Sequence, residues 1–453
     1  MNISKSNQKQ IIAVIGCGYV GLTTAAIFAN CGFKVYALEK DPKRLNIIKS
    51  GRSFFYELGI DPLIAKGIKT GNLIVTDDLD TTIPMCSIIF SCVGTPDNPD
   101  GSSNLTHVFE VARKVADLIK PGSVFIQKST VPVGTGKIIE QLFNDTKKKT
   151  NYISSPEFLR EGTGVGDMLW PERIVVGGDN KQAVNTVLDL YGDIEKNRGT
   201  ISKTAKLTAP KIIPKISYIH TSRNSAELIK ITANAFLALK ISFANSIAKL
   251  ADKTDADINE VMEAVGSDHR IGRAFLNSGR GYGGGCFPKD VSGLIHSAKE
   301  HGLKMEIMEA VTSVNDSMPH YVIDQTRLAL GGSLNNVRVS VLGLSFKAQT
   351  SDTRQSPSIL MANTLVSHGA IVKAHDPIAM EEARHALHSA VELSKSLLHA
   401  IEDAECVIIG TEWSEFNKID WSGVKARLVV DAMNCLDRTK IPERIQYLGI
   451  GLR

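Results

Sequence analysis

Short apolar runs separated by helical patterns predict a doubly wound α/β fold for the first part of the chain. Ile11–Ile15 is apolar and β-branched, as buried parallel strands are, and Lys34–Leu38 is interpreted as the next strand. An alanine-rich helical pattern at Leu22–Asn30 lies between them. Further strands are predicted at Ser87–Val93, Val124–Gln127, Asn151–Ser155 and Ile174–Gly178, the last of which closes this domain. Strands that alternate with helices form parallel sheets covered on both faces.

The middle of the chain is predicted to be helical. Ser222–Lys253 is the longest helical pattern, and its apolar residues lie almost all round, as in helices buried between domains or subunits. Shorter helices are predicted at Ile258–Val265, Val291–Glu300 and Met305–Gln325. Asn197–Ser217, which precedes them, is rich in Lys, Arg and Pro and has no clear period, so we expect an exposed loop or linker there.

The last third repeats the strand–helix alternation. Strands are predicted at Val337–Leu342, Ile371–His375, Glu405–Gly410 and Leu428–Asp431, with a helix at Ser358–Ser367. Gly32–Pro42 and Gly369–Pro377 share one order of features, namely a helix stop, a strand, an acidic residue and a proline. The expected organisation is an α/β protein with two related doubly wound, Rossmann-like domains at 1–205 and 331–453, joined by a central helical region at 206–330 that contains the long helix.

Composition excludes several classes of function. The net charge of +4 is small for 453 residues and gives no case for nucleic-acid binding. No apolar run reaches 18 residues and the first ten are polar, so neither a membrane span nor a signal peptide is expected. The seven cysteines are scattered without a CxxC pair, which favours reduced thiols in a cytoplasm. The eleven histidines form no metal-binding pattern, so no metal is expected.

A G-x-G-x-x-G motif joins the first predicted strand to its helix. In that context it is typical of a dinucleotide site, in which the helix N-terminus holds the pyrophosphate. Glu39 ends the next strand, where a carboxylate holds the ribose hydroxyls of NAD and repels the 2′-phosphate of NADP, although Lys40 and Arg44 weaken that preference. A glycine-rich turn without a ligand is the alternative. The residues assigned to the cofactor here are Gly16, Gly18, Tyr19, Val20, Gly21, Glu39 and Arg44.

Small polar residues follow two later strands, at Thr95 and Thr130. Ligands of open α/β sheets bind at the carboxyl ends of strands, so both are candidate contacts. In Pro156–Gly162, Glu157 and Glu161 are four residues apart and would share a face on one helical turn.

The densest cluster of unusual residues is Gly281–Asp290, which places four glycines just before Cys286. Glycine permits positive φ and close approach of a ligand to the backbone. The nearby cation of Lys289 favours a thiolate nucleophile, and a tight turn with a structural cysteine is the competing interpretation. Lys230 and Asn234 project from one face of the long helix, and Lys230 is either functional or a salt-bridged structural lysine.

The second doubly wound domain lacks the dinucleotide glycines, so it is a natural place for a different nucleotide. Lys347 and Arg354 are candidate contacts with its phosphates.

These motifs together resemble the UDP-glucose/GDP-mannose dehydrogenases over nearly the whole chain. The matching segments are Gly16–Gly21, Val93–Pro96, Ser129–Gly134, Pro156–Gly162, Glu227–Lys240, Gly281–Asp290 and Gly343–Pro357. Pro156–Gly162, Trp170–Ile174 and Gly285–Asp290 are most similar to the members that oxidise UDP-glucose at C6.

The resemblance implies an enzyme that converts a primary alcohol to a carboxylate in a four-electron oxidation, here UDP-glucose to UDP-glucuronate, with two NAD per sugar. Cys286 would form a thiohemiacetal and then a thioester, and Lys230 and Asn234 would stabilise the oxyanion. Glu157 would be the base for hydrolysis, with Thr130 and Asp290 placing the water.

The resemblance also implies further contacts and a partner. Cofactor contacts would come from Thr95, Thr130, Glu161, Lys289 and Arg354. The substrate would be held by Glu157, Phe158, Leu159, Arg160, Glu161, Lys230, Asn234, Arg270, Phe275, Tyr282, Gly283, Phe287 and Lys347. Arg270 would reach in from a partner subunit, because the long helix forms the core of a dimer in this family, so a homodimer or a higher oligomer is expected.

Three features depart from the family pattern: Gly285 replaces the usual serine, Glu39 replaces the usual aspartate, and the Asn197–Ser217 linker is longer. The alternative functions are the same chemistry on GDP-mannose or a UDP-N-acetylhexosamine, a two-electron β-hydroxyacid dehydrogenase, and a non-catalytic NAD-binding sensor. The β-hydroxyacid enzymes need neither the thiol nor a second α/β domain.

Overall fold

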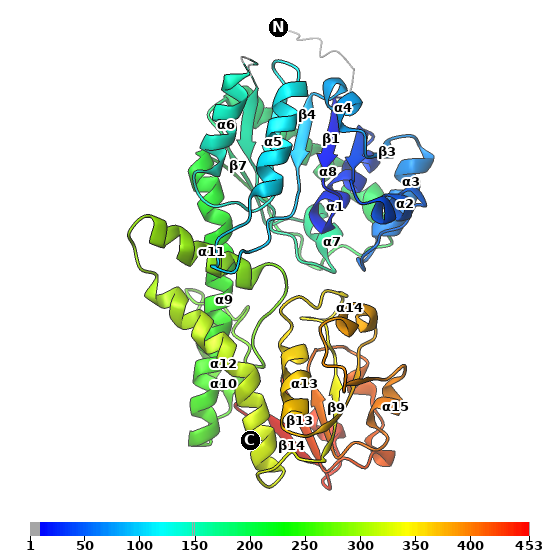
Figure 1. Ribbon diagram of the computed structural model, residues 1–453, viewed down its shortest axis with the longest axis vertical. Coiled ribbons are helices and arrows are strands. Elements are labelled where there is room, and N and C mark those ends of the chain that lie inside the picture. Colours follow the sequence, from blue (N-terminus) through cyan, green and yellow to red (C-terminus); the bar gives the residue numbers. More distant parts are fainter. Residues whose placement is uncertain (1–9, 147, 149, 453) are drawn as a thin grey trace. The chain divides into compact units, whose positions relative to one another are not determined.

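The computed structural model describes residues 10–146, 148 and 150–452 (Figure 1). Residues 1–9, on which the expectation of no signal peptide rests, lie outside the described residues. The chain divides into two units, Met1–Thr232 and Ala233–Arg453. The boundary falls within helix α9 (Arg223–Thr254), so this helix contributes residues to both units.

The first unit is built on an eight-stranded sheet with the order β3-β2-β1-β4-β5-β6-β7-β8. All neighbours are parallel except β6 and β7, which are antiparallel. The strands are β1 (Ile11–Ile15), β2 (Lys34–Leu38), β3 (Leu73–Thr76), β4 (Ile88–Ser91), β5 (Val124–Gln127), β6 (Asn151–Ser154), β7 (Arg173–Gly177) and β8 (Ser217–Thr221). The chain order reverses between β1 and β4, which is the ligand-binding switch point of a doubly wound sheet.

Helices cover both faces of this sheet, because alternate residues of each strand enter opposite cores. Ile12 and Val14 of β1 pack with α1, α3, α7 and α8, whereas Ala13 and Ile15 pack with α5 and α6. The helices are α1 (Tyr19–Asn30), α2 (Pro42–Lys49), α3 (Ile60–Lys69), α4 (Leu79–Thr82), α5 (Thr106–Leu118), α6 (Thr135–Asp145), α7 (Gly164–Leu169) and α8 (Lys181–Ala205).

The second unit contains a six-stranded, all-parallel sheet with the order β11-β10-β9-β12-β13-β14. Its strands are β9 (Arg338–Leu342), β10 (Ile371–His375), β11 (Glu392–Leu393), β12 (Cys406–Ile409), β13 (Leu428–Asp431) and β14 (Gln446–Gly449). Its helices are α10 (Ile258–Gly266), α11 (Phe287–Glu300), α12 (Glu306–Ala329), α13 (Pro357–Ser367), α14 (Met380–Arg384) and α15 (Leu397–Ile401). The switch point lies between β9 and β12, so the prediction of two doubly wound α/β sheets is confirmed.

Three local predictions are wrong. Asn197–Ala205 is not a linker but the last part of α8, where Ile201 and Ala205 are buried in the core. The sheet does not end at Gly178, because β8 adds an edge strand beside β7. Pro156–Gly162 forms no helical turn around Glu157, since residues 155–160 have no regular structure and a helix begins only at Gly164.

Helix α9 is the one helix in the described part of the chain that is long and apolar enough to cross a membrane, judged by length and composition alone. Of its most apolar stretch, 44% is buried inside the protein, and buried core helices pass the same test. The expected absence of a membrane span therefore stays a prediction.

Candidate active site

The glycine motif of the first unit forms a tight turn with open space beside it. Gly16 has φ +88°, and its N–H donates to the Leu38 carbonyl at 2.9 Å. A Cβ on Gly21 would lie 1.8 Å from the Gly16 carbonyl oxygen, so Gly21 permits the helix to pack on the turn. A Cβ on Gly18 would meet no atom within 4 Å, and no side chain caps α1 there. These residues fit a dinucleotide, because the turn leaves room and free N–H groups for a pyrophosphate.

Glu39 lies at the carboxyl end of β2, as predicted, and is 7% exposed. Its carboxylate accepts hydrogen bonds from the N–H groups of Cys17, at 3.3 Å, and Asp41, at 3.0 Å. Glu39 therefore holds the glycine turn and retains acceptor capacity for ribose hydroxyls. The guanidinium of Arg44 lies 4.7 Å from the centre of the Phe54 ring.

Tyr19 connects the glycine motif to two other loops of this unit. Its hydroxyl donates to the Glu57 carboxylate and lies 2.7 Å from the Arg160 carbonyl oxygen, and it accepts the Gly164 N–H at 3.1 Å. Glu57 also accepts the Val165 N–H at 2.9 Å. Burial raises the pKa of Glu57, because an ionised carboxylate is costly away from water.

Glu157 and Lys230 form a buried ion pair. The Lys230 ammonium lies 3.1 Å from a Glu157 oxygen, and the two side chains are 3% and 7% exposed respectively. The other Glu157 oxygen accepts the Leu159 N–H. Phe158 lies near two cations, with the Arg173 guanidinium 4.0 Å and the Lys230 ammonium 5.4 Å from its ring centre. Lys230 is thus salt-bridged, and its position beside a carboxylate and an aromatic face is also suited to a binding site.

The other predicted residues of this unit lie around the ends of β4, β5 and β6. The Thr95 hydroxyl donates to the Thr130 carbonyl at 3.0 Å, which joins the loops after β4 and β5. Glu161 lies in the turn before α7. The Arg160 side chain is exposed and pairs with Asp167 at 2.6 Å.

Glu227, on α9, anchors the loop that follows β5. Its two oxygens accept the N–H groups of Gly134, at 2.7 Å, and Gly136, at 2.8 Å, at the start of α6. The side chain is 2% exposed, and burial raises its pKa to about 7, although both hydrogen bonds oppose the shift. Glu227 therefore fixes the segment that carries Thr130.

In the second unit, Cys286 is half-buried and is the N-cap residue of α11. Its carbonyl accepts the Asp290 N–H at 2.9 Å, which places Asp290 one turn into the helix. The Asp290 carboxylate accepts the Asn234 amide at 2.6 Å and pairs with Lys289 at 2.5 Å. The structure thus brings Asn234, Lys289 and Asp290 together, and the positive end of the helix dipole favours a thiolate at its start.

The glycines before Cys286 are packed against their own chain. A Cβ on Gly283 would lie 2.2 Å from the Gln355 carbonyl oxygen, and one on Gly284 would lie 2.8 Å from the Phe346 ring. A Cβ on Gly285 would lie 2.4 Å from the Arg354 guanidinium carbon. Gly281 and Gly284 have positive φ, as expected, but the close approach at these three glycines comes from residues 346–355 of the protein rather than from a ligand.

The remaining predicted residues of this unit form separate groups. Phe287 contacts two aromatic rings, those of Phe275 and Tyr282, at centroid distances of 6.2 and 5.8 Å. Arg270 is exposed and pairs with Asp268 at 2.5 Å. Arg354 pairs with Asp352 at 2.6 Å, and the Lys347 ammonium lies 5.7 Å from the Phe346 ring centre.

Asp376, which the sequence analysis did not single out as a site residue, takes the place in the second sheet that Glu39 has in the first. It follows β10, and it holds the loop after β9 much as Glu39 holds the loop after β1. Its carboxylate accepts hydrogen bonds from six donors: Leu344 N–H, Ser345 N–H, Ser345 O–H, Ile378 N–H, Ala379 N–H and Trp413 Nε1–H. This carboxylate is saturated by its own chain.

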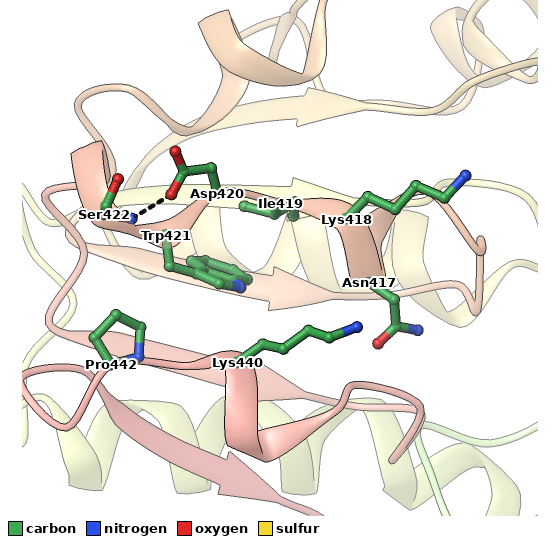
Figure 2. Close-up of a pocket in the computed structure, with 8 residues that line it drawn as sticks. All are labelled: Asn417, Lys418, Ile419, Asp420, Trp421, Ser422, Lys440 and Pro442. Atoms are coloured by element: carbon green, nitrogen blue, oxygen red, sulfur yellow. Dashed lines mark hydrogen bonds between the residues drawn. The ribbon is translucent and has the colours of Figure 1, made fainter.

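A shallow pocket of about 540 Å³ lies elsewhere in the second unit (Figure 2). It is lined by Asn417, Lys418, Ile419, Asp420, Trp421, Ser422, Lys440 and Pro442. None of the predicted site residues lines it, and the Asp420 carboxylate is engaged by the Ser422 N–H at 3.0 Å. In the part of the chain that the structure describes, no group of three His, Cys, Asp or Glu side chains could hold a metal ion.

Glu57 and Glu227 are functional candidates that sequence reasoning missed. Glu227 lies in a segment that was matched to the family, but no role was given to it. The available signal was that Glu227 is a lone carboxylate on an otherwise apolar helix face. Such a carboxylate indicates a specific contact, because a buried charge requires partners. Glu57 has no comparable signal in the sequence.

Comparison with known proteins gives matches along nearly the whole chain. Residues 10–195, 224–317 and 340–438 match the NAD binding, central and UDP binding domains of the UDP-glucose/GDP-mannose dehydrogenase family. The chain is 35% identical to a UDP-glucose 6-dehydrogenase of Rhizobium meliloti (97% of this chain, 99% of the relative) and 37% identical to UDP-glucose 6-dehydrogenase TuaD of Bacillus subtilis (93% and 89%). A solved UDP-glucose dehydrogenase from Pyrobaculum islandicum is similar over 100% of both chains, with a TM-score of 0.88 and 34% identity.

Proposed function

Because the chain belongs to the UDP-glucose/GDP-mannose dehydrogenase family, we propose that it is an NAD-dependent UDP-glucose 6-dehydrogenase. The product is UDP-glucuronate, formed by two successive two-electron oxidations at C6 of the sugar. Residues 1–205 serve the cofactor, 206–330 carry the thiol, and 331–453 hold the UDP moiety. The observation that carries the proposal is a half-buried thiol, Cys286, at the start of α11, one turn before the buried Asp290–Asn234 pair.

NAD, when bound, accepts one hydride in each oxidation. The chain supplies the rest of the chemistry. Lys230 and Asn234 donate hydrogen bonds to the substrate oxygen, which stabilises the negative charge that develops on it. The Cys286 sulfur then adds to the aldehyde carbon, because an aldehyde has no leaving group and must become a tetrahedral adduct before a second hydride can depart.

The second oxidation converts the Cys286 adduct to a thioester, which water must cleave. Glu157 removes a proton from that water, with Thr130 and Asp290 placing it, and Cys286 leaves as the thiolate. In the structure a Glu157 oxygen lies 3.1 Å from the Lys230 ammonium, so the proposed base and an oxyanion donor are neighbours.

The substrate and cofactor contacts remain those expected from the sequence. Phe158, Leu159, Arg160, Phe275, Tyr282, Gly283, Phe287 and Lys347 contact the sugar nucleotide, and Thr95, Glu161, Lys289 and Arg354 complete the cofactor site. Arg270 is exposed, which is consistent with a contact made across a homodimer or a higher oligomer. A cytoplasmic location is supported by the seven cysteines, all of which are described and form no disulfide.

Two observations disfavour the rivals. A β-hydroxyacid dehydrogenase would need neither Cys286 nor the second sheet, and a non-catalytic sensor would need neither Cys286 nor the Glu157–Lys230 pair. GDP-mannose and UDP-N-acetylhexosamines are the alternative substrates.

The test uses limiting UDP-glucose and excess NAD, with NADH counted per sugar for the wild type and for Cys286→Ser. Two NADH per sugar, together with loss of net turnover in the variant, are expected. One NADH per sugar, unaffected by the variant, would refute the thiol mechanism. No NADH with UDP-glucose but turnover of GDP-mannose or a UDP-N-acetylhexosamine would refute the substrate assignment alone.

A further inference from the structure

Arg280, just before the glycine run, is a fully buried cation that makes no direct contact with a carboxylate in the described part of the chain. Its side chain is 0% exposed, and it forms no ion pair within the described residues. Burial lowers its pKa to about 10, so the guanidinium remains protonated at neutral pH. Buried charges are costly, which raises the question of what this guanidinium does.

The residue crosses the carboxyl ends of three neighbouring strands of the second sheet. Its backbone N–H donates to Ala432, directly after β13, at 2.8 Å. Its Nε donates to the carbonyl of Gly410, directly after β12. Its Nη2 donates to the carbonyl of Phe346, in the loop after β9, at 2.9 Å, with Ser345 at 3.3 Å. Backbone carbonyl oxygens thus accept its hydrogen bonds, while the carboxylates of Glu412 and Asp376 favour the charge from a greater distance.

This position is the switch point of the second sheet. In the first unit the equivalent crevice lies between β1 and β4, where Cys92 N–H donates to the Ile15 carbonyl at 2.8 Å. In the second unit Gly410 N–H donates to the Leu342 carbonyl at 2.7 Å in the same way. A switch-point crevice is normally where a ligand binds, and here the protein's own guanidinium occupies it.

Both ends of the glycine loop are therefore attached to the same sheet. Arg280 fixes the first end, and the close contacts of Gly283 and Gly285 with residues 354–355 fix the second. Between these attachments, Tyr282 N–H donates to the Asn315 side chain at 2.8 Å. Cys286 is the next residue after the second attachment.

We propose that Arg280 is a positioning residue for Cys286: by filling the switch-point crevice of the second sheet, it holds the start of the loop that presents the thiol. The proposal rests on the proposed role of Cys286 as the nucleophile. Arg280 acts through the loop and touches neither substrate nor cofactor. Small displacements of a reacting group reduce rates strongly, about 100-fold for 1 Å.

The variants Arg280→Gln and Arg280→Lys test this inference. Glutamine removes the charge and the guanidinium group that donates to several carbonyls at once. Lysine retains the charge and can donate to one carbonyl. Arg280→Gln should lower kcat about tenfold or more, Arg280→Lys should lower it less, and KM for NAD should change less than about twofold. Arg444→Gln is the control, because Arg444 also donates to two backbone carbonyls of this unit, those of Trp421 and Ser422.

A second readout needs no turnover, which separates this inference from the proposed function. The rate at which iodoacetamide labels Cys286 is measured by peptide mass spectrometry, with the Arg444→Gln variant as the reference. Arg280→Gln should change the Cys286 rate about threefold or more, whereas Arg444→Gln should leave it unchanged. An unchanged Cys286 rate and unchanged kcat would overturn the inference, even if UDP-glucose proved not to be the substrate. If the glutamine variant does not fold, Arg280→Lys decides by the same two measurements.

Discussion

The Lys230 ammonium and the Glu157 carboxylate lie 3.1 Å apart, and both side chains are almost fully buried. Each charge depends on the other, because a buried ion that loses its partner pays the whole desolvation penalty. The sequence analysis gave both residues a role in one reaction, Lys230 as a donor to the oxyanion and Glu157 as the base for hydrolysis. Stability and catalysis are therefore coupled at this point.

Glu157→Gln should reduce both. Loss of the carboxylate removes the anion 3.1 Å from the buried Lys230 ammonium, so the free energy of unfolding should fall by about 3–5 kcal/mol in urea titrations. Net turnover should fall about 100-fold or more, because the water that cleaves the thioester loses its base. Asp80→Asn, which breaks an exposed ion pair with Lys114 in the same unit, is the control and should be much milder. Full turnover by Glu157→Gln would remove Glu157 from the hydrolytic step.

Alanine at two neighbouring glycines should have unequal effects. At Gly283 the new methyl would meet the Gln355 carbonyl oxygen at 2.2 Å, whereas at Gly285 it would meet the movable guanidinium of Arg354 at 2.4 Å. Backbone cannot move aside as a side-chain end can, so Gly283→Ala should cost about 1–3 kcal/mol and Gly285→Ala less than about 1 kcal/mol. Thermal unfolding measures both, and equal losses would contradict the packing described for this loop.

The cofactor motif offers a similar comparison. Gly18→Ala should fold normally, because no atom lies within 4 Å of the new methyl, but NAD affinity should fall about tenfold, or 1.4 kcal/mol, since the methyl fills the ligand's space. Gly21→Ala should instead lower the melting temperature, because its methyl would overlap the Gly16 carbonyl. Calorimetric titration with NAD distinguishes the two. An unaltered NAD affinity in Gly18→Ala would place the dinucleotide elsewhere.

Glu227 should make stability depend on pH. Its pKa is about 7 in the folded chain and near 4.5 when unfolded, so the folded state binds more protons between these values. The favourable contribution is complete below about pH 4.5 and is lost as pH rises through about 7, on the order of 3 kcal/mol in all.

Glu227→Gln should remove this component of the pH dependence. The unfolding free energy of the variant should therefore fall less between pH 5 and pH 8 than that of the wild type. Below about pH 7 the substitution should also lower stability, because an amide has one acceptor oxygen for two N–H donors. A wild-type profile parallel to that of the variant would mean that Glu227 does not titrate in this range.

The sequence predicted the parts of the fold in which local pattern and tertiary packing agree. β1 was found because its apolar residues match buried structure along its length. Helix α9 was found because its helical pattern is long and uninterrupted by Gly or Pro, although Phe236 and Leu250 are exposed. β8 was missed because Ser217–Thr221 is a largely exposed edge strand with a polar sequence. The end of α8 was missed because its Lys and Arg residues conceal a narrow buried stripe at Ile201 and Ala205.

At the site, residue types were easier to predict than their connections. The sequence indicated Lys230, Glu157 and Asp290, but it placed Glu157 on a helical turn that does not form. The Asn234–Asp290 hydrogen bond joins residues 56 positions apart, and no local pattern encodes it. The glycines before Cys286 were correctly seen as special, whereas the groups that approach them are known only from the fold.

The saturation of Asp376 has a consequence for attempts to redesign the chain. A carboxylate offers about four lone-pair positions, and six donors already share those of Asp376, whereas only two engage Glu39. Cofactor preference in the first sheet is thus open to change by a single substitution at position 39. Introducing the three motif glycines after β9 would not create a second dinucleotide site, because Asp376 has no acceptor position left for a ribose hydroxyl. To free one, the loops after β9 and β10 would both have to be rebuilt, since both donate to this carboxylate.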